Sequence, residues 1–472
     1  MTDFRLESDS IGEKKVPKDA YYGVQSLRGK ENFFITGNPT HPEMIRGLAM
    51  VKKGCAMSNN KAGVLADDKA NAIIKACDRI LDGEFLDQFI ADPIQGGAGT
   101  ISNMNANEVI ANIANEILGG GLGTYEHVHP NDHVNMGQST NDAFPTSGKI
   151  GALNLLEKLY PELDELVKSL GNKAKEFENT LKMGRTQLQD AVPITLGQEF
   201  NAYQSAIKRD IKRIKHAAEA LKVVNMGASA IGTGINVDKN YFNTIVPDIS
   251  EVTGFDLKQA EDLVDGTQNI DCFAEVSGAL KCLAINMSKM SNDLRLMGSG
   301  PKTMVGDINL PPRANGSSIM PGKVNPIIPE VVSQSAFRVI GNDVTITMCA
   351  EGGQMELNAF EPVALYSLYQ SIEFLTHAAN TLRINCIDGI TANEEKLKAD
   401  IEHSVGIVTA LVPHIGYVES ARIAKEALRT GKPLRELILR DKLMTEENLN
   451  RVLDPKEMTH PGIAAEELLL NK

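Results

Sequence analysis

The middle of the chain carries long stripes of apolar residues at the spacing of an α-helix. Between 146 and 390 these positions recur every three or four residues, and no strand-like alternation reaches a comparable length. The pattern predicts five long helices, each burying one face in a bundle. Pro161 lies inside the first stripe and is expected to kink that helix. The clearest stripes are Leu155, Leu159, Leu163, Leu166 and Leu170; Phe200, Tyr203, Ile207, Ile211 and Ile214; and Phe273, Val276, Leu280, Ala284 and Met287, with two further helices predicted at about 329–348 and 362–387.

The patterns on either side of this bundle predict a mainly α protein of three domains. Residues 1–141 hold short helical stretches between prolines and glycines, the clearest at about 67–81 and 103–118. They form an N-terminal mixed, mostly helical domain. Residues 142–390 form the central long-helix bundle, and 391–472 form a small helical C-terminal domain.

The C-terminal domain is defined by explicit signals for helix ends. Thr391 and Glu394 have the spacing of a capping box, and Asp454 precedes a proline as an N-cap does. Gly431 is placed as a C-cap. These signals predict short helices, and no residue of this domain is predicted to carry chemistry.

The composition fits packed helices in an acidic, soluble protein. Aromatic residues make up only 5% of the chain and Trp is absent, so the core is aliphatic. The net charge of −13 disfavours nucleic acid or an anionic membrane as a partner. An anionic substrate would therefore need a locally positive pocket. Five long helices also carry more apolar surface than one slim bundle readily buries, which favours a homo-oligomer.

Cysteine use and the N-terminus predict the cellular compartment. The six cysteines are scattered without a Cys-x-x-Cys pair, which is typical of reduced thiols in a cytosolic protein. The first residues lack the apolar segment of a signal peptide, and the longest uncharged runs are too short to span a bilayer. We therefore expect a cytoplasmic protein.

A histidine-rich segment before the bundle invites a metal-site hypothesis. His127, His129, Asp132 and His133 are close in sequence, and such side chains ligate transition metals. Pro130, however, prevents a helix from stacking His129 above His133. Structural or hydrogen-bonding roles are commoner for loop histidines, so the sequence assigns no metal site.

Residues 138–142 form a run of small hydrogen-bonding side chains, Gln-Ser-Thr-Asn-Asp. One interpretation is a helix N-terminal cap, because these residue types are preferred there. The other is a carboxylate-binding site, because a helix N-terminus offers unpaired N–H groups and a positive dipole end. The sequence leaves both open.

The densest concentration of candidate chemistry is the segment 316–326, Gly-Ser-Ser-Ile-Met-Pro-Gly-Lys-Val-Asn-Pro. Its two prolines exclude a helix interior or a central strand, and its two glycines allow sharp turns. The segment therefore predicts a loop that presents backbone N–H groups, Lys323 and Asn325 to a small anion. It is not a phosphate-binding P-loop, because Val324 follows Lys323 where that motif needs Ser or Thr.

These segments, in this order on a bundle pattern, closely resemble the aspartase/fumarase superfamily of lyases. Residues 317–326 look like its signature loop, and 138–145 and 184–190 look like its two other shared regions. The resemblance extends over essentially the whole chain, from residues 12–23 to the C-terminal domain. It implies a three-domain fold with a homotetrameric helical core and active sites shared between subunits.

Within the superfamily the resemblance favours ammonia elimination from L-aspartate over the hydration chemistry of class II fumarases. Thr140 and Ala143 are similar to the aspartase version, whereas fumarases typically carry Ser and Thr there. Gln187 stands where most members have a histidine, which fumarases tie to a glutamate matching Glu330 and which is implicated in protonation. The implied reaction is the reversible deamination of L-aspartate to fumarate and ammonia, with the general acid unassigned.

The resemblance also implies roles for individual residues. Ser317 is the base, while Lys323 and loop N–H groups ease its loss of a proton and hold the dianionic aci-carboxylate intermediate. Glu330 has a supporting role. The other substrate groups are expected to meet mostly neutral donors, namely Thr100, Ser139, Thr140, Asn141, Thr186, Gln187, Ser318 and Asn325, together with Lys323.

The expected partner is a small dicarboxylate, L-aspartate or fumarate, and no organic cofactor is implied. Divalent cations activate some aspartases, but no ligand spacing assigns a site here. Residues 129–132 are similar to a secondary anion-binding spot in fumarases. Two rival hypotheses are a class II fumarase acting on L-malate and a structural protein of the lens-crystallin kind; intact Ser317, Lys323 and Asn325 disfavour lost activity.

Overall fold

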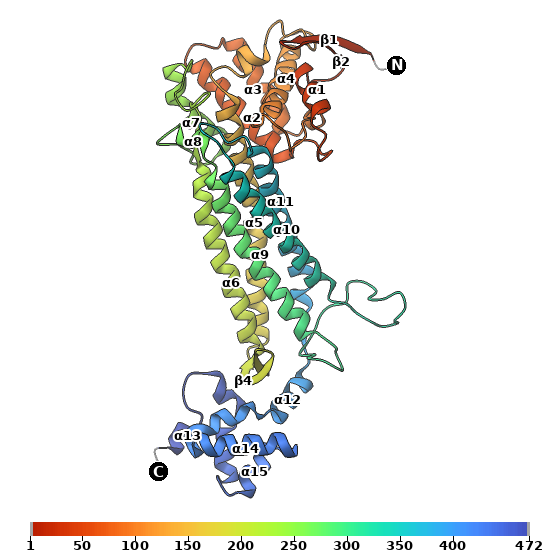
Figure 1. Cartoon of the computed structure of the whole chain (residues 1–472), viewed down its shortest axis with the longest axis vertical. Helices are drawn as coiled ribbons and strands as arrows, with labels where there is room; N and C mark the ends of the chain where they lie inside the picture. Colours follow the sequence, from red (N-terminus) through yellow and green to blue (C-terminus); the bar gives the residue numbers. More distant parts are fainter. Residues whose placement is uncertain (1–2, 470–472) are drawn as a thin grey trace. The chain divides into compact units, whose positions relative to one another are not determined.

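The computed structural model of the chain describes residues 3–469 and is mainly helical, as predicted (Figure 1). Its contacts divide it into two compact units. The first contains the described chain up to Pro161 together with Asp210–Ala284 and Ser335–Thr376. The second contains Glu162–Arg209, Ile285–Gln334 and the described chain from His377 onward.

Five long helices follow the predicted apolar stripes. Leu159, Leu163 and Leu166, from the stripe of the first helix, are completely buried. That helix continues through Pro161, the position at which a kink is expected. The five are α5 (Thr140–Glu176), α6 (Leu196–Ala218), α9 (Asp271–Met297), α10 (Ile327–Glu351) and α11 (Glu361–Asn385).

Shorter elements of the first unit gather around helix α2. This helix packs against α3 and α7, and α3 packs against α4. Helix α3 has the predicted bounds, and α4 begins slightly before its predicted start. The elements are the antiparallel strands β1 (Phe4–Asp9) and β2 (Gly12–Pro17), α1 (Val24–Asn32), α2 (Pro42–Lys61), α3 (Asp67–Leu81), η1 (Leu86–Gln88), α4 (Thr100–Ile117), η2 (Pro130–Val134), η3 (Glu219–Lys222), the parallel strands β5 (Val223–Val224) and β6 (Lys258–Gln259), α7 (Lys239–Thr253) and α8 (Asp265–Gln268).

The second unit contains an antiparallel hairpin that the sequence did not predict. Strand β3 (Leu181–Thr186) pairs with β4 (Gln189–Thr195). Gln187 and Leu188 both have positive φ, the geometry of a tight two-residue turn. This pair of residues is not the Asn-Gly or Asp-Gly pair that normally marks such a turn. The sequence therefore gave little indication of a hairpin.

The C-terminal part of the second unit is a set of short helices around an aliphatic core that includes Leu411, Ile423 and Leu437. The predicted caps at Asp454 and Gly431 are confirmed. The elements are β7 (Ile308–Asn309) pairing with β8 (Thr391–Ala392), η4 (Ile387–Gly389), α12 (Glu394–His403), η5 (Val405–Leu411), α13 (Val412–Ile415), α14 (Tyr417–Thr430), α15 (Leu434–Arg440), α16 (Glu446–Val452), η6 (Pro455–Thr459) and η7 (Glu466–Leu468).

The predicted capping box at Thr391 is wrong. Thr391 lies in strand β8, where its Oγ1 accepts a hydrogen bond from Asn309 at 3.2 Å. Helix α12 therefore starts at Glu394, with Asn393 as its N-cap. Pairing with a strand far away in the sequence takes the threonine out of the helix start.

The six cysteines, all within the described chain, are free thiols. Burial raises the pKa of Cys55 and of Cys386 to about 12. Of the helices in the described part of the chain, none combines the length and the apolarity needed to cross a membrane.

Candidate active site

The polar segment 138–142 caps helix α5. The Ser139 Oγ accepts a hydrogen bond from the Asn141 N–H at 3.2 Å, and the Ser139 N–H donates to Asp142 Oδ1 at 3.0 Å. This reciprocal arrangement is that of a capping box, so the capping hypothesis is confirmed. The positive end of a long helix lies beside these residues, and the carboxylate-binding hypothesis stays a prediction.

The neighbouring side chains Thr140 and Asn141 are held by fixed partners. Thr140 Oγ1 accepts from Asn103 Nδ2 at 3.1 Å. Asn141 Nδ2 donates to the Ala230 carbonyl at 2.7 Å. Both side chains therefore have defined positions, which suits groups that orient a ligand.

Behind this segment lies a completely buried lysine, Lys52 of helix α2. Its Nζ donates to Asn135 Oδ1 at 2.9 Å and to Gln138 Oε1 at 2.7 Å. Asn135 Oδ1 also accepts from Asn103, which donates to Thr140 as well. Burial lowers the pKa of Lys52 from 10.5 to about 8. The lysine thus anchors the amides that support the start of α5.

Asp142 is the buried acid of the same region. Its Oδ2 accepts from the Ser229 N–H at 3.0 Å, which ties the 226–236 connection to the start of α5. Burial raises the pKa of this carboxyl to about 7, although the N–H groups of Ser229 and Ser139 and the nearby Lys52 favour its charged form.

Thr100 lies at the first position of helix α4, after a turn of Gly97, Ala98 and Gly99 that all have positive φ. Its Oγ1 donates to the Gly97 carbonyl at 2.7 Å. A Cβ at Gly99 would lie 2.4 Å from the Phe144 ring, so glycine is needed for this close approach. The exposed threonine hydroxyl is thereby fixed at a helix N-terminus.

Thr186 and Gln187 lie at the exposed tip of the β3–β4 hairpin. Arg185, the residue before them, forms an ion pair with Asp307, with Nη1 2.8 Å from Oδ2. The tip of the hairpin is consequently held from one side by an ion pair and is open on the other.

In the 316–326 loop, Ser317 is surrounded by backbone donors. Its Oγ accepts hydrogen bonds from the N–H groups of Ile319 at 3.1 Å and Met320 at 2.9 Å. N–H groups that point at an oxygen favour its negatively charged form. Ser318, next in the chain, is exposed.

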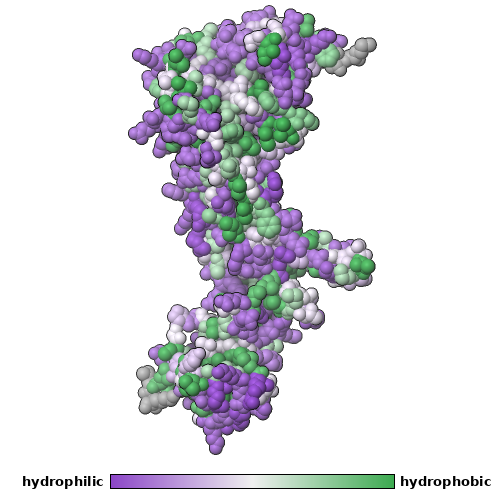
Figure 2. Space-filling model, viewed as in Figure 1, coloured by the Kyte–Doolittle hydropathy of each residue, from purple (hydrophilic) through white to green (hydrophobic). Residues whose placement is uncertain are grey.

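The loop is closed on itself at its base. Asn325 Nδ2 donates to the Gly316 carbonyl. A Cβ on Gly316 would come within 2.0 Å of the Lys323 carbonyl oxygen, so the backbone at the two ends of the loop is in direct contact there. Figure 1 shows this segment projecting from the ends of α9 and α10, and Figure 2 shows hydrophobic side chains at its tip, where Ile319 is 83% exposed. Lys323 is exposed as well.

Glu330 lies in the first turn of α10, and its Oε1 is 3.9 Å from Arg295 Nη2 on α9. The predicted site residues therefore form two sets. Thr100, Ser139, Thr140 and Asn141 belong to the first compact unit; Thr186, Gln187, Ser317, Ser318, Lys323, Asn325 and Glu330 belong to the second.

The sequence did not identify Lys52, Asp142 or Arg185 as supporting residues. Lys52 has one available signal, because it is a charged residue on an otherwise apolar helical face next to Val51. Arg185 has no such signal in the sequence, because its partner Asp307 is far away in the chain.

The histidine-rich segment forms a short π-helical turn, η2. His129 Nδ1 lies 3.3 Å from Asp132 Oδ2, and His133 Nε2 lies 2.9 Å from Lys69 Nζ. Within residues 3–469, no group of three or more His, Cys, Asp or Glu side chains is placed to hold a metal ion. His129 and His133 thus interact with polar side chains close to them.

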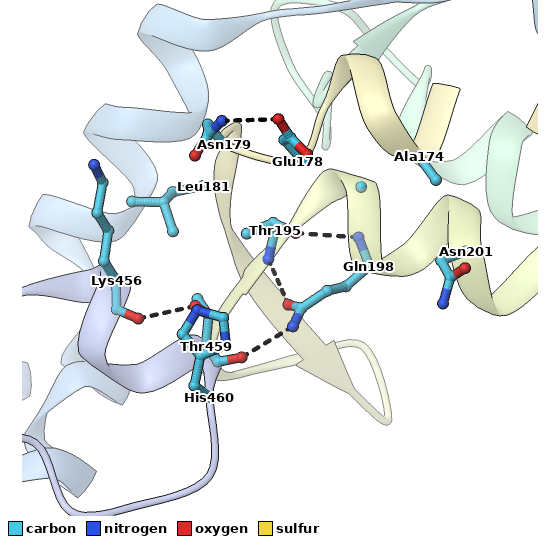
Figure 3. Close-up of a pocket in the computed structure, with 11 residues that line it drawn as sticks. Ala174, Glu178, Asn179, Leu181, Thr195, Gln198, Asn201, Lys456, Thr459 and His460 are labelled. Carbon is cyan, nitrogen blue, oxygen red and sulfur yellow. Dashed lines mark hydrogen bonds between the residues drawn. The ribbon is translucent and has the colours of Figure 1, made fainter. Parts of the chain in front are cut away.

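A cavity of about 360 Å³ in the second unit lies between the end of α5, the start of α6 and the 456–460 segment (Figure 3). Thr195 and Gln198 cap α6 there by reciprocal hydrogen bonds, and Gln198 Nε2 donates to the Thr459 carbonyl at 2.9 Å. None of its lining residues is a predicted site residue. Thr195 and Gln198 therefore serve to cap the helix and to attach the C-terminal segment.

Two family models match the chain. One is described as lyase and matches residues 12–341, and the other is described as the fumarase C C-terminus and matches residues 407–460.

Individual relatives match along nearly their whole length. An aspartate ammonia-lyase from a Bacillus species is 53% identical, covering 98% of this chain and 99% of the relative. Those of Bacillus subtilis and Escherichia coli K12 are 52% and 49% identical, covering 99% and 98% of this chain and 98% and 97% of the relatives.

Solved structures agree in fold. A fumarate lyase/delta crystallin from Brucella melitensis, bound to cobalt, has a TM-score of 0.95 at 46% identity, and a class II fumarase from Schistosoma mansoni has a TM-score of 0.93 at 33% identity. Each covers 97% of this chain and 100% of the solved chain.

The raised pKa of Asp142 predicts a pH dependence of stability. Between pH 4 and 7 the folded chain keeps a proton on this carboxyl that the unfolded chain releases, because its pKa rises from 3.8 to about 7 on folding. The contribution of Asp142 to stability therefore falls as the pH rises through this range. Urea unfolding of the wild type and of Asp142→Asn should show the variant gaining in relative stability from pH 4 to 7, with little further change above it.

The exposed Asp262 provides the control substitution Asp262→Asn, which should not show this trend. A difference between wild type and Asp142→Asn that stays level from pH 4 to 7 would contradict the prediction.

Proposed function

The chain belongs to the lyase family that includes the aspartate ammonia-lyases, and we propose that it eliminates ammonia through the 316–326 loop and the polar segments described above. Its activity is that of an aspartate ammonia-lyase, the reversible deamination of L-aspartate to fumarate and ammonia. The observation that carries the assignment is 53% identity to an aspartate ammonia-lyase over 98% of the chain, against 33% to the class II fumarase.

In the proposed mechanism Ser317 removes the proton from the carbon next to the side-chain carboxylate of L-aspartate. The electron pair moves into that carboxylate, which becomes a dianionic aci-carboxylate. The intermediate then expels ammonia from the neighbouring carbon and leaves the double bond of fumarate. The difficult step is the added negative charge, so the site must bind the intermediate more strongly than the substrate.

The surroundings of Ser317 support its role as the base. A serine hydroxyl is a weak base unless its charged form is stabilised. The N–H groups of Ile319 and Met320 already point at Oγ, and the positive charge of Lys323 is carried by the same loop. These groups favour the serine alkoxide and can stabilise the developing carboxylate charge, with Asn325 as a further amide donor.

We assign the remaining substrate contacts to Thr100, Ser139, Thr140, Asn141, Thr186, Gln187 and Ser318. The first four lie at the N-termini of α4 and α5, where the helix dipole favours an anion. Gln187 cannot supply a proton as a histidine does. An amine leaves readily in its ammonium form, which reduces the need for a dedicated acid.

We also propose a homotetramer in which helices of several subunits form one core and subunits share the active sites. Helix α10 supports this, because Phe337, Val344 and Met348 are 62%, 59% and 60% exposed on one face of the helix. Gly341 lies on the same face with open space where its Cβ would be, which lets another helix approach closely.

The activity is tested by following the ultraviolet absorbance of fumarate. The wild type should produce a rise with L-aspartate and none with L-malate. Ser317→Ala should lower kcat by about 10²–10⁴-fold, the usual cost of losing a general base. Ser10→Ala, in the exposed turn between β1 and β2, should leave kcat unchanged. A rise mainly with L-malate would make the protein a fumarase, and a fully active Ser317→Ala would remove Ser317 as the base.

The contact between Gly316 and the Lys323 carbonyl predicts a difference between the two loop glycines. Gly316→Ala would push Lys323 away, and a displacement of about 1 Å lowers kcat/KM by about 100-fold. Gly322 has φ +80° but open space around it, so Gly322→Ala adds only backbone strain of about 1–2 kcal/mol. Steady-state kinetics should show the larger loss for Gly316→Ala; equal losses would contradict the proposed role of this contact.

The oligomer is tested by light scattering after size-exclusion chromatography. The wild type should have about four times the 51.2 kDa mass of the chain. Phe337→Asp should reduce that mass, since it places a charge in the proposed core. Val418→Asp, at a residue 81% exposed on α14, should not. A monomeric wild type would refute the tetramer.

A further inference from the structure

Asp307 is a completely buried carboxylate that the proposed mechanism does not use. Its Oδ2 lies 2.9 Å from Lys182 Nζ and 2.8 Å from Arg185 Nη1, both on strand β3. Within the described chain its other oxygen, Oδ1, is buried without a hydrogen-bond partner. One carboxylate oxygen therefore holds two cations of the same strand.

The two cations continue the network on either side. Lys182 Nζ also lies 2.8 Å from Glu199 Oε2 on helix α6. Arg185 Nη2 lies 3.5 Å from Asp400 Oδ2 on α12, which itself pairs with Lys396 at 2.7 Å. Charges of both signs thus alternate through the network, and Asp307 lies at its most buried point.

The backbone of Asp307 is fixed as firmly as its side chain. Its N–H donates to the Met297 carbonyl at the end of α9, at 2.8 Å, and its carbonyl accepts from the Asn393 N–H at 2.9 Å. The next two residues form β7, and the chain then runs on to the 316–326 loop. Asp307 is therefore a firmly held point at the start of the segment that leads to the loop. Strand β7 and the hydrogen bonds from Arg313 to the Ile384 and Asn385 carbonyls hold that segment further along.

The hairpin needs such a support at its tip. A two-stranded hairpin is marginally stable by itself, and this one has an irregular register between Met183 and Arg185. Besides the Arg185 pairs, the hydrogen bond from Ser404 Oγ to Asp190 Oδ2 at 2.8 Å holds the opposite strand. Arg185 directly precedes Thr186, so the direction of its side chain helps to set where Thr186 and Gln187 lie.

We propose that Asp307 is a positioning residue for the ammonia-lyase reaction. It holds Arg185, and through it the Thr186–Gln187 turn, in a fixed place relative to the start of the 316–326 loop. This inference rests on the proposed function, because Thr186, Gln187 and Ser317 have roles only in that reaction. Loss of the Asp307 charge should therefore weaken substrate binding as well as reduce stability.

The test compares Asp307→Asn with a buried carboxylate elsewhere. Asp248, held by Lys61 and Ser58 in the first unit, supplies the matched control Asp248→Asn. Both variants should melt at lower temperature than the wild type. With L-aspartate below both melting temperatures, Asp307→Asn should lower kcat/KM at least tenfold, mainly by raising KM, whereas Asp248→Asn should stay within twofold of wild type. Asp307→Glu, which keeps the charge, should recover part of the loss.

If Asp307→Asn does not fold, Arg185→Gln tests the same proposal. Arg185 is partly exposed, so this substitution should reduce stability less than Asp307→Asn does. It should raise KM in the same way, and the double variant should be no worse than the poorer single variant. An active wild type with unchanged kcat/KM in the folded variants, or with additive losses in the double variant, would overturn this inference alone. A wild type inactive on L-aspartate would overturn the proposed function, and this inference with it.

Discussion

Burial of one apolar stripe on each long helix determines where polar chemistry can occur in this protein. Each fully buried aliphatic side chain, such as Leu159 or Leu163 of α5, contributes roughly 1.5–3 kcal/mol. The buried faces therefore have little room for unpaired polar groups. The groups proposed to bind an anion or move a proton lie instead at helix ends and connections: the start of α5, the β3–β4 turn and the 316–326 loop.

These ends are held by buried ionisable groups, and each has a different set of polar partners. Lys52 is surrounded by neutral amide oxygens, Asp142 by backbone N–H groups, and Asp307 by two cations. A buried charge is costly unless it is paired or hydrogen-bonded, and removing its partner is more costly still. The supporting residues are thus constrained as strongly as the residues that they support.

The sequence predicted what depends on local pattern. The long helices, the caps at Asp454 and Gly431 and the 316–326 loop follow from periodicity or from residue types with fixed backbone preferences. The family followed from long motifs in a fixed order.

What the sequence could not predict depends on contacts between distant segments. Lys52 and Lys53 are adjacent and chemically identical, yet one is buried against Asn135 and the other pairs with Asp78. Likewise, the local sequence predicts Thr391 to be a helix cap, but its pairing with Asn309 places it in a strand. The β3–β4 hairpin was not predicted because its turn, Gln187-Leu188, lacks the glycine that usually marks a tight turn.

The contacts described for the 316–326 loop are among its own residues: backbone N–H groups on Ser317, the Asn325 amide on Gly316, and Gly316 against Lys323. A segment built in this way keeps its internal geometry when its neighbours change. In the proposed mechanism, substitutions on the β3–β4 turn or at the start of α5 can then alter which acid is bound while the proposed proton-abstracting arrangement stays intact. A change of substrate preference in such a scaffold requires few substitutions, and none of them has to disrupt the 316–326 loop.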